Sequence, residues 1–325
     1  MNRPLVYVTR KLAVDPKVVL GPQFDVAVWP GERAPTRDEL LAAAADAAGL
    51  LTLLSDPVDD ALLSRLPKLR IVANYAVGYD NVDVKAAAAR GIWVTNTPDV
   101  LTDATADIAF TLLLAVARRV REGERMVREG RFHGWGPTML LGQDLAGKTI
   151  GIFGFGRIGQ AMARRARGFG MKVLYTQRSR APEAVERELA AEKVPFHDLL
   201  ERSDVISIHC PLTPETRHAF GRAELARMKQ GAILVNTGRG PVVDEAALFE
   251  ALESGHLFGA GLDVYEREPT VHPGLLRRDD VVLLPHLGSA GQDTRRVMAE
   301  LALGDIARVL LGDRPRHPVN EPVGR

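Results

Sequence analysis

Short apolar runs alternate along this chain with longer segments rich in alanine, leucine and arginine. Most of the runs are apolar on both faces, which is typical of parallel strands that helices cover on two sides. Strands are expected at Leu5–Val8, Val26–Trp29, Leu50–Leu54, Ile71–Asn74, Trp93–Asn96, Thr149–Phe153, Lys172–Tyr175, Val205–His209, Ala232–Asn236, Ala260–Val264 and Val281–Leu284. The pattern predicts an α/β architecture with doubly wound parallel sheets.

The expected strands fall into two groups, separated by a helical pattern at Thr102–Glu129 and a polar segment at Gly130–Leu145. A length of 325 residues also favours two domains. A last helical pattern at Asp293–Leu311 has no strand after it, so we expect it to return and complete the N-terminal domain. The predicted domains are therefore residues 1–98 with 290–325, and residues 99–289.

Composition narrows the class of protein. Hydrophobic residues at 46% and charged residues at 26% are ordinary for a globular protein, and a net charge of +1 gives no reason to expect nucleic acid or an anionic membrane. The only cysteine, Cys210, excludes an internal disulfide, and no Cys/His spacing predicts a metal site. Polar residues 9–11 interrupt any secretory signal, and the apolar stretch Ile108–Ala117 is far below the ~20 residues of a membrane span. We expect a cytoplasmic protein.

A glycine motif follows the strand expected at Thr149–Phe153. It reads Gly154-x-Gly156-x-x-Gly159 and leads into a helical pattern. Such glycines permit a tight turn, close approach of a pyrophosphate and close helix packing, and the helix amino end with Arg157 and Ile158 supplies amide donors. The motif predicts dinucleotide binding; the alternative is a plain turn between a strand and a helix.

The next strand lacks the acidic residue that binds a ribose 2′-hydroxyl. No Asp or Glu occurs between Leu174 and Glu183, and Arg178, Ser179 and Arg180 stand there instead. Arginine matches a 2′-phosphate that a carboxylate would repel. The segment therefore favours NADP(H) over NAD(H), unless the arginines only form a solvated loop.

Three charged groups follow later strands, where open α/β sheets bind ligands. They are Arg239 between Gly238 and Gly240, Glu268 before a proline, and His286 after one. At these motifs the sequence resembles the D-isomer-specific 2-hydroxyacid dehydrogenase family over essentially the whole chain. The segments Tyr75–Asp83, Asn96–Thr102 and Leu174–Arg178 make it most similar to the glyoxylate/hydroxypyruvate reductases within that family. The resemblance implies a flavodoxin-like substrate-binding domain and a Rossmann NAD(P)-binding domain with a cleft between them.

The resemblance also implies catalytic roles that the chemistry of the residues supports. His286 would be the general acid for the carbonyl oxygen during hydride transfer, because histidine changes charge near neutral pH. Glu268 would accept a hydrogen bond from the other ring nitrogen, and Arg239 would bind the substrate carboxylate. Glu266 is a rival for Glu268, but the family motif has its acid directly before proline.

The family resemblance implies further contacts. Val77 and Gly78 would hold the substrate carboxylate through their amides, Asp263 would contact the nicotinamide amide, and Cys210 would be a wall of the cofactor site rather than a nucleophile. The remaining candidates for cofactor or substrate binding are Pro211, Thr237, Gly238, Gly288 and Ser289.

Trp135 lies in the polar segment between the two groups of strands. By resemblance to the reductases, it would reach the active site of a partner subunit in a homodimer. Simple core packing of the indole is the alternative.

The prediction is an NADPH-preferring reductase of small 2-oxo acids such as glyoxylate and hydroxypyruvate. Two alternatives stay open. One is a D-3-phosphoglycerate dehydrogenase, although a chain ending at Arg325 has no room for the regulatory domain of its longer forms. The other is a dinucleotide-sensing corepressor module. A formate dehydrogenase is disfavoured, because that group carries glutamine where Glu268 stands.

Overall fold

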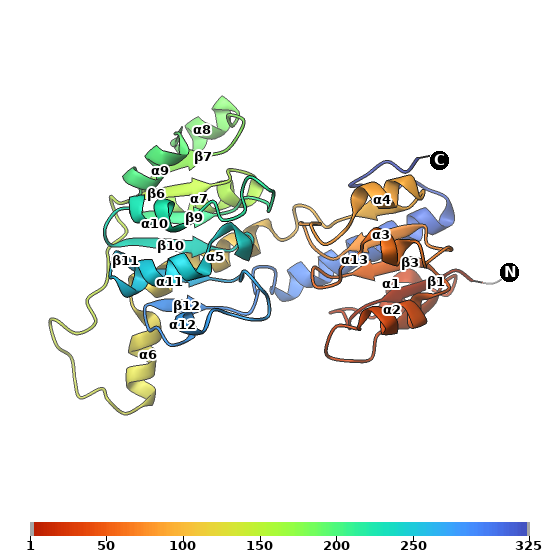
Figure 1. Cartoon of the computed structure of the whole chain (residues 1–325), viewed down its shortest axis with the longest axis horizontal. Coiled ribbons are helices and arrows are strands. Elements are labelled where there is room, and N and C mark those ends of the chain that lie inside the picture. The colour runs from red at the N-terminus through yellow and green to blue at the C-terminus, as the bar shows by residue number, and fades with distance from the viewer. Residues whose placement is uncertain (1–2, 324–325) are drawn as a thin grey trace. The chain divides into compact units, whose positions relative to one another are not determined.

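The computed structural model describes residues 3–323, so the expected domain ranges extend two residues beyond the described chain at each end. The chain divides into two compact units, Met1–Leu101 with Ala290–Arg325 (unit 1) and Thr102–Ser289 (unit 2). Each unit holds one sheet with helices on both faces (Figure 1), which confirms the predicted α/β class with two parallel sheets. Within residues 3–323, no helix is long and apolar enough to cross a membrane.

Unit 1 contains a five-stranded sheet in the order β2-β1-β3-β4-β5, which is the flavodoxin-like order. Its strands are β1 (Leu5–Val8), β2 (Asp25–Val28), β3 (Ala47–Thr52), β4 (Ile71–Asn74) and β5 (Trp93–Thr95). Its helices are α1 (Pro16–Leu20), α2 (Arg37–Ala44), α3 (Asp60–Leu63), α4 (Val84–Ala89) and α13 (Gln292–Leu311).

Alternate residues of these strands enter two separate cores. Tyr7, Leu50 and Val72 pack with the apolar residues of α2, α3 and α4. Their neighbours Val6 and Leu51 pack on the opposite face with α13, the blue helix that lies against the orange strands in Figure 1. Burial on both faces explains why the strands are apolar throughout.

Unit 2 contains a seven-stranded sheet in the order β12-β11-β10-β9-β6-β7-β8, the Rossmann order with one further strand. Its strands are β6 (Thr149–Phe153), β7 (Lys172–Thr176), β8 (Ala191–Lys193), β9 (Val205–Ile208), β10 (Ala232–Asn236), β11 (Leu257–Leu262) and β12 (Val281–Leu283). Its helices are α5 (Thr102–Ala117), α6 (Val120–Arg128), α7 (Arg157–Gly168), α8 (Glu183–Leu189), α9 (Phe196–Arg202), α10 (Arg222–Arg227), η1 (Gly240–Val242), α11 (Glu245–Glu253) and α12 (Pro273–Leu276).

The helix expected at Thr102–Glu129 is broken into α5 and α6. Arg119 adopts a left-handed conformation with φ of 51°, and the backbone N–H of Gln143 donates to the Ala117 carbonyl at the end of α5. A Cβ on Gly142 would lie 2.1 Å from that same oxygen. A later segment of the chain therefore packs over the helix end, which a local pattern does not reveal.

Strand limits also differ from the predicted ones. The strand expected at Ala260–Val264 is β11 (Leu257–Leu262), so Asp263 lies directly after the strand. The edge strand β8 was missed because it is only three residues long and two of them are charged. Short polar edge strands give almost no apolar signal.

Candidate active site

The glycine loop after β6 needs glycine at two positions for packing. Gly154 has φ of +96°, and a Cβ there would lie 2.6 Å from the backbone nitrogen of Cys210. A Cβ on Gly159 would lie 2.3 Å from the carbonyl oxygen of Gly154. The first glycine therefore lets the loop pass β9, and the third lets α7 pack against the loop.

Gly156 is different, because a Cβ there would meet nothing within 4 Å. Gly156 is the N-cap residue of α7, and no side chain accepts a hydrogen bond from the backbone N–H groups of the first turn at this cap. That turn begins with Arg157 and Ile158. Amide donors and a positive dipole at such a helix end attract an anion. The open face and the helix end together fit the pyrophosphate of a dinucleotide.

The residue directly after β7 is Gln177, whose side chain is an amide and not a carboxylate. The side-chain oxygen Oε1 of Gln177 accepts the N–H of Phe155 at 3.2 Å, which ties this end to the glycine loop. Next along the chain, Arg180 forms an ion pair with Glu186, at 2.8 Å between Nη2 and Oε2. The hydrogen bond from Arg180 lowers the pKa of Glu186. Arg180 is therefore already bound to a carboxylate of its own unit.

Arg178 is exposed, and its side chain makes no hydrogen bond or ion pair with another residue of 3–323. The pKa of Glu215 is lowered, chiefly by a hydrogen bond from Thr213 and more weakly by the charge of Arg178. Arg178 thus lies near the loop after β9. Of the two arginines it has the guanidinium more available to an incoming anion, with exposed Ser179 beside it.

Two titratable groups follow β9, the half-buried His209 and the buried Cys210. Burial raises the pKa of Cys210 to about 12, so its thiol is protonated and is not a ready nucleophile. Burial lowers the pKa of His209 to about 3, and its ring contacts the hydroxyls of Ser207 at 2.8 Å and Thr237 at 3.4 Å. His209 is not among the site residues expected from the sequence, although its place directly after a buried strand was an available signal.

Arg239 lies in a rigid turn at the end of β10. The buried Asn236 side chain accepts the N–H of Gly238 and donates to the carbonyl of Arg239, both at 3.0 Å. A Cβ on Gly240 would lie 1.8 Å from the carbonyl oxygen of Tyr265. This packing explains the glycine after Arg239, because no other residue fits there.

Glu268 and His286 form a hydrogen-bonded pair, with 3.0 Å between Oε2 and Nδ1. Burial acts to raise the pKa of Glu268, but His286, the Tyr265 N–H and the charge of Arg239 outweigh it and lower that pKa overall. The other ring nitrogen of His286, Nε2, makes no hydrogen bond with any residue that the structure describes. The pair can therefore hold a proton at Nε2 beside a stable carboxylate.

Asp263 supports the turn that carries His286. His286 has φ of +57°, which is uncommon for a residue with a side chain. The two carboxylate oxygens of Asp263 accept the N–H groups of Leu287 at 2.6 Å and Gly288 at 2.7 Å. Burial raises the pKa of Asp263 against the effect of these amides. Asp263 therefore stabilises the turn that carries His286. The half-buried Ser289 lies at the end of this turn.

Glu266, the rival for the catalytic acid, has a different partner. Its Oε1 lies 3.0 Å from Nε2 of His218. Glu268 is therefore the carboxylate that contacts His286, as the residue before proline was expected to do.

The site residues predicted from the sequence lie in three parts of the structure. Val77 and Gly78 lie in unit 1, in the loop after β4, and Trp135 lies in the segment after α6. The others lie in unit 2, in the loops after β6, β7, β9, β10, β11 and β12: Gly154, Gly156, Arg157, Ile158, Gly159, Arg178, Ser179, Arg180, Cys210, Pro211, Thr237, Gly238, Arg239, Asp263, Glu268, His286, Gly288 and Ser289. Residues 3–323 contain no cluster of His, Cys, Asp or Glu suited to a metal ion.

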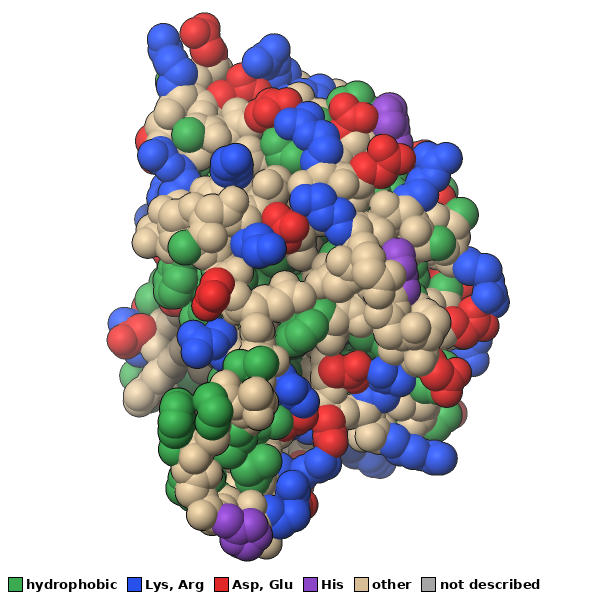
Figure 2. All heavy atoms as spheres, turned by 90° about the vertical axis from the view of Figure 1, so that its left-hand side faces the viewer, with side chains coloured by type: hydrophobic (Ala, Val, Ile, Leu, Met, Phe, Trp, Pro, Cys, Tyr) green, Lys and Arg blue, Asp and Glu red, His purple; other side chains and the backbone are tan. Residues whose placement is uncertain are grey.

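Trp135 is 82% exposed, so it is not packed in a core of the described chain. Figure 2 shows apolar side chains gathered at the lower end of the face that includes α6 and the segment after it. Helix α6 and residues 131–142 together are called the apolar arm, and its exposed large hydrophobic residues are Val120, Val127, Phe132, Trp135, Met139 and Leu141.

Comparison with known proteins gives consistent results. The D-isomer specific 2-hydroxyacid dehydrogenase, NAD binding domain, matches residues 110–288. Glyoxylate reductase of Thermococcus litoralis is 50% identical over 325 residues, covering 99% of this chain and 98% of that protein. Glyoxylate reductase of Thermococcus kodakarensis is 51% identical, covering 99% and 97%.

A solved structure agrees over the whole chain. The NADPH-dependent glyoxylate/hydroxypyruvate reductase of Sinorhizobium meliloti, in complex with NADP and malonate, superposes with a TM-score of 0.86 at 38% identity, covering 98% of each chain. The resemblance seen in the sequence motifs is thereby confirmed. This chain belongs to the D-isomer-specific 2-hydroxyacid dehydrogenase family and is an NAD(P)-dependent oxidoreductase.

Proposed function

We propose that this enzyme reduces small 2-oxo acids to 2-hydroxy acids, namely glyoxylate to glycolate, which is achiral, and hydroxypyruvate to D-glycerate. The observation that carries the proposal is the hydrogen bond between Glu268 and His286, close to Arg239. These residues and the glycine loop all follow the carboxyl ends of strands in the sheet of unit 2. Relatives named glyoxylate reductase match this chain over nearly its full length. Residues 1–98 with 290–325 would bind the substrate, and residues 99–289 would bind the dinucleotide.

The proposed reaction moves one hydride and one proton. When bound, the dinucleotide supplies the hydride to the carbonyl carbon. His286 gives the proton from Nε2 to the carbonyl oxygen, so that the carbonyl becomes a hydroxyl and the imidazole is left neutral. Glu268, whose pKa is lowered, stays a carboxylate and stabilises the protonated ring before transfer. Arg239 binds the carboxylate of the substrate and polarises its carbonyl group.

We further propose that NADPH is preferred over NADH. The support is the exposed Arg178 guanidinium, which makes no hydrogen bond or ion pair with another residue of the described chain, and the absence of Asp and Glu from residues 177–182. Arg178 and Ser179 would bind the 2′-phosphate, while Arg180 contributes less because Glu186 already holds it. The related reductase from Sinorhizobium meliloti is described as NADPH-dependent.

A matrix of substrates and cofactors tests these proposals. Purified protein is assayed for oxidation of NADPH and of NADH with glyoxylate, hydroxypyruvate, pyruvate and phosphohydroxypyruvate. We expect the highest kcat/KM with NADPH and one of the first two acids, and D-glycerate as the product from hydroxypyruvate. The highest kcat/KM with phosphohydroxypyruvate would indicate a D-3-phosphoglycerate dehydrogenase. No oxidation with any acid would leave a dinucleotide-sensing module.

We also propose that the apolar arm of α6 and residues 131–142 binds a second copy of this chain, with Trp135 reaching the partner's active site. The support is the concentration of exposed apolar side chains on this arm, because such patches commonly mark protein contacts. Sedimentation of the wild type should give a dimer, and Val127→Asp with Leu141→Asp should give a monomer. A monomeric wild type would reject the proposal.

A further inference from the structure

The loop after β4 is held to the rest of unit 1 by its carbonyl groups. The side-chain amide of Asn96 donates to the carbonyl of Val77 at 2.8 Å. The side-chain amide of Asn74 donates to the carbonyl of Gly78, also at 2.8 Å. Two asparagines from the ends of β4 and β5 therefore fix consecutive peptide groups of this loop.

The preceding peptide group is fixed in the same way by the main chain. The backbone N–H of Thr97 donates to the carbonyl of Ala76 at 2.8 Å. By contrast, the N–H groups of Val77 and Gly78 donate to no other residue that the structure describes. The loop thus directs its carbonyls to the protein and leaves two neighbouring amide donors for a ligand.

The geometry of the peptide bond connects the two observations. In a trans peptide the C=O of one residue and the N–H of the next lie in one plane and point in opposite directions. A hydrogen bond from Asn96 to the Val77 carbonyl therefore sets the direction of the Gly78 N–H. Asn74 fixes the peptide on the other side of Gly78 and so limits rotation about that residue.

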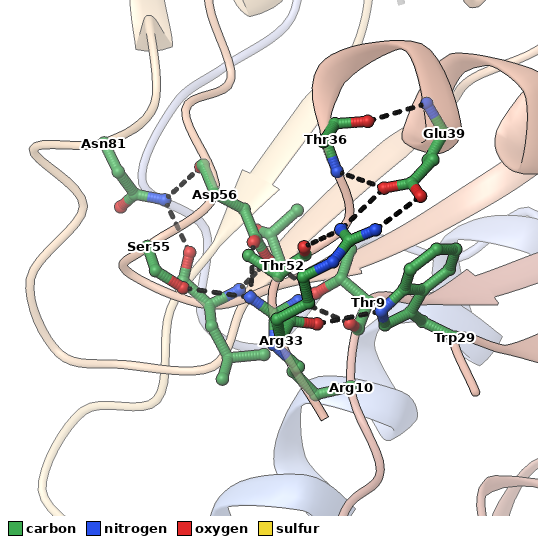
Figure 3. A network of polar contacts seen from close by, with 12 residues as sticks. Thr9, Arg10, Trp29, Arg33, Thr36, Glu39, Thr52, Ser55, Asp56 and Asn81 are labelled. Atoms are coloured by element: carbon green, nitrogen blue, oxygen red, sulfur yellow. Dashed lines mark hydrogen bonds and ion pairs between the residues drawn. The ribbon is translucent and has the colours of Figure 1, made fainter. Parts of the chain in front are cut away.

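Asn74 is itself held by a buried network. Its Oδ1 accepts hydrogen bonds from the Thr52 hydroxyl and from Nδ2 of Asn81, each at 3.1 Å. The same Nδ2 of Asn81 lies 3.0 Å from the carbonyl oxygens of Leu53 and Asp56, contacts that can be followed in Figure 3. Because its neighbours are fixed, the Asn74 amide has little freedom to follow a moving loop.

We propose that Asn96, supported by Asn74, is a positioning residue that orients the Gly78 N–H toward the carboxylate of the substrate. The inference rests on the proposed function, in which the amides of Val77 and Gly78 bind that carboxylate. An oriented amide costs no reorganisation when the anion arrives, whereas a loose loop must be ordered at each binding event. Sequence reasoning included Asn96 only within a family motif and gave it no role.

Asn96→Ala tests the role, because Asn96 is only half-buried and its loss removes one donor. We expect KM for glyoxylate and the inhibition constant of oxamate, a small carboxylate probe, to rise together by about tenfold. The kcat should stay within about threefold of wild type, and NADPH affinity should not change, because Asn96 holds only substrate-binding backbone. Asn96→Asp, which replaces the donor with a carboxylate facing the Val77 carbonyl, should raise both constants further.

Asn320→Ala is the matched control. Asn320 is another half-buried asparagine of unit 1 that bonds the backbone of β5 and its flank, through the N–H of Val94 and the carbonyl of Ile92. It should lower Tm without changing KM or oxamate inhibition. If Asn96→Ala behaves like Asn320→Ala, or if kcat falls while KM is unchanged, the positioning role is wrong. Absence of turnover by the wild type would instead overturn the proposed function itself, and the inference with it.

Discussion

The carboxyl edges of the two sheets use polar side chains in different ways. In unit 1, the asparagines Asn74 and Asn96 hold backbone, and the charges of Arg10 and Asp56 are paired at 3.1 Å with both side chains largely buried. In unit 2, Glu268 and His286 are each more than a third exposed and contact each other. In our proposals, the first edge orients backbone amides for the substrate, and the second carries the groups that transfer the proton. Substitutions at the two edges should therefore damage different properties.

The largest expected effect is on the rate, from His286→Asn. Loss of the proton donor should lower kcat by about a thousandfold. KM should change little, because the group acts mainly in the transition state. Thermal unfolding should be nearly unchanged, because the ring is 36% exposed. Steady-state kinetics measures kcat and KM, and calorimetry measures Tm. His197→Asn, at an exposed histidine, is the control that should change none of them. A large fall in Tm would show that His286 is mainly structural.

At the other edge, Asp56→Asn should damage stability instead of rate. The carboxylate is 2% exposed, pairs with Arg10 and accepts the Thr9 hydroxyl at 2.5 Å (Figure 3). Breaking such a pair leaves a buried charge without its partner, so the free energy of unfolding should fall by about 3 kcal/mol. Denaturant titration measures this free energy of unfolding. The kcat of the variant should stay near that of the wild type.

Asp46→Asn is the comparison for Asp56, because the Asp46–Lys68 pair is exposed and should contribute less than about 1 kcal/mol. Equal losses of unfolding free energy in the two variants would contradict the difference in burial.

Arg178→Ala should produce a selective loss of cofactor binding. Removal of one charge-assisted contact to the 2′-phosphate should raise KM for NADPH about thirtyfold and leave KM for NADH unchanged. Arg180→Ala, which breaks the ion pair with Glu186, should change NADPH binding less. The ranking of the two arginines is wrong if Arg180→Ala has the larger effect on NADPH.

The smallest expected effect is a displacement of the pH profile by Glu268→Gln. The pKa of Glu268 is lowered from 4.5, so the native carboxylate is charged throughout the neutral range and its support for protonated His286 is lost only on acidification below that value. Without this charge, the alkaline decline of the reduction rate should begin about half to one pH unit lower. A profile that coincides with that of the wild type would show that the carboxylate only orients the ring.

Much of the fold could be predicted because its strands are buried on both faces and therefore apolar without interruption. Gly154 and Gly159 could also be read from the sequence, since strand, glycine turn and helix are adjacent in the chain. The prediction failed where the deciding contact comes from elsewhere. Helix α5 ends where Gln143 reaches the Ala117 carbonyl, and β8 forms only because β7 is beside it.

By itself, the sequence determined that Arg239, Glu268 and His286 follow parallel strands, and parallel strands place such residues at one edge of a sheet. Only the tertiary structure decided which partners each group has. Glu268, not Glu266, contacts His286. Arg178 is exposed, whereas Arg180 binds Glu186. Asn96 donates a hydrogen bond to the Val77 carbonyl. The reason is physical: a hydrogen bond depends on tenths of an ångström between groups far apart in the chain, and packing sets those distances.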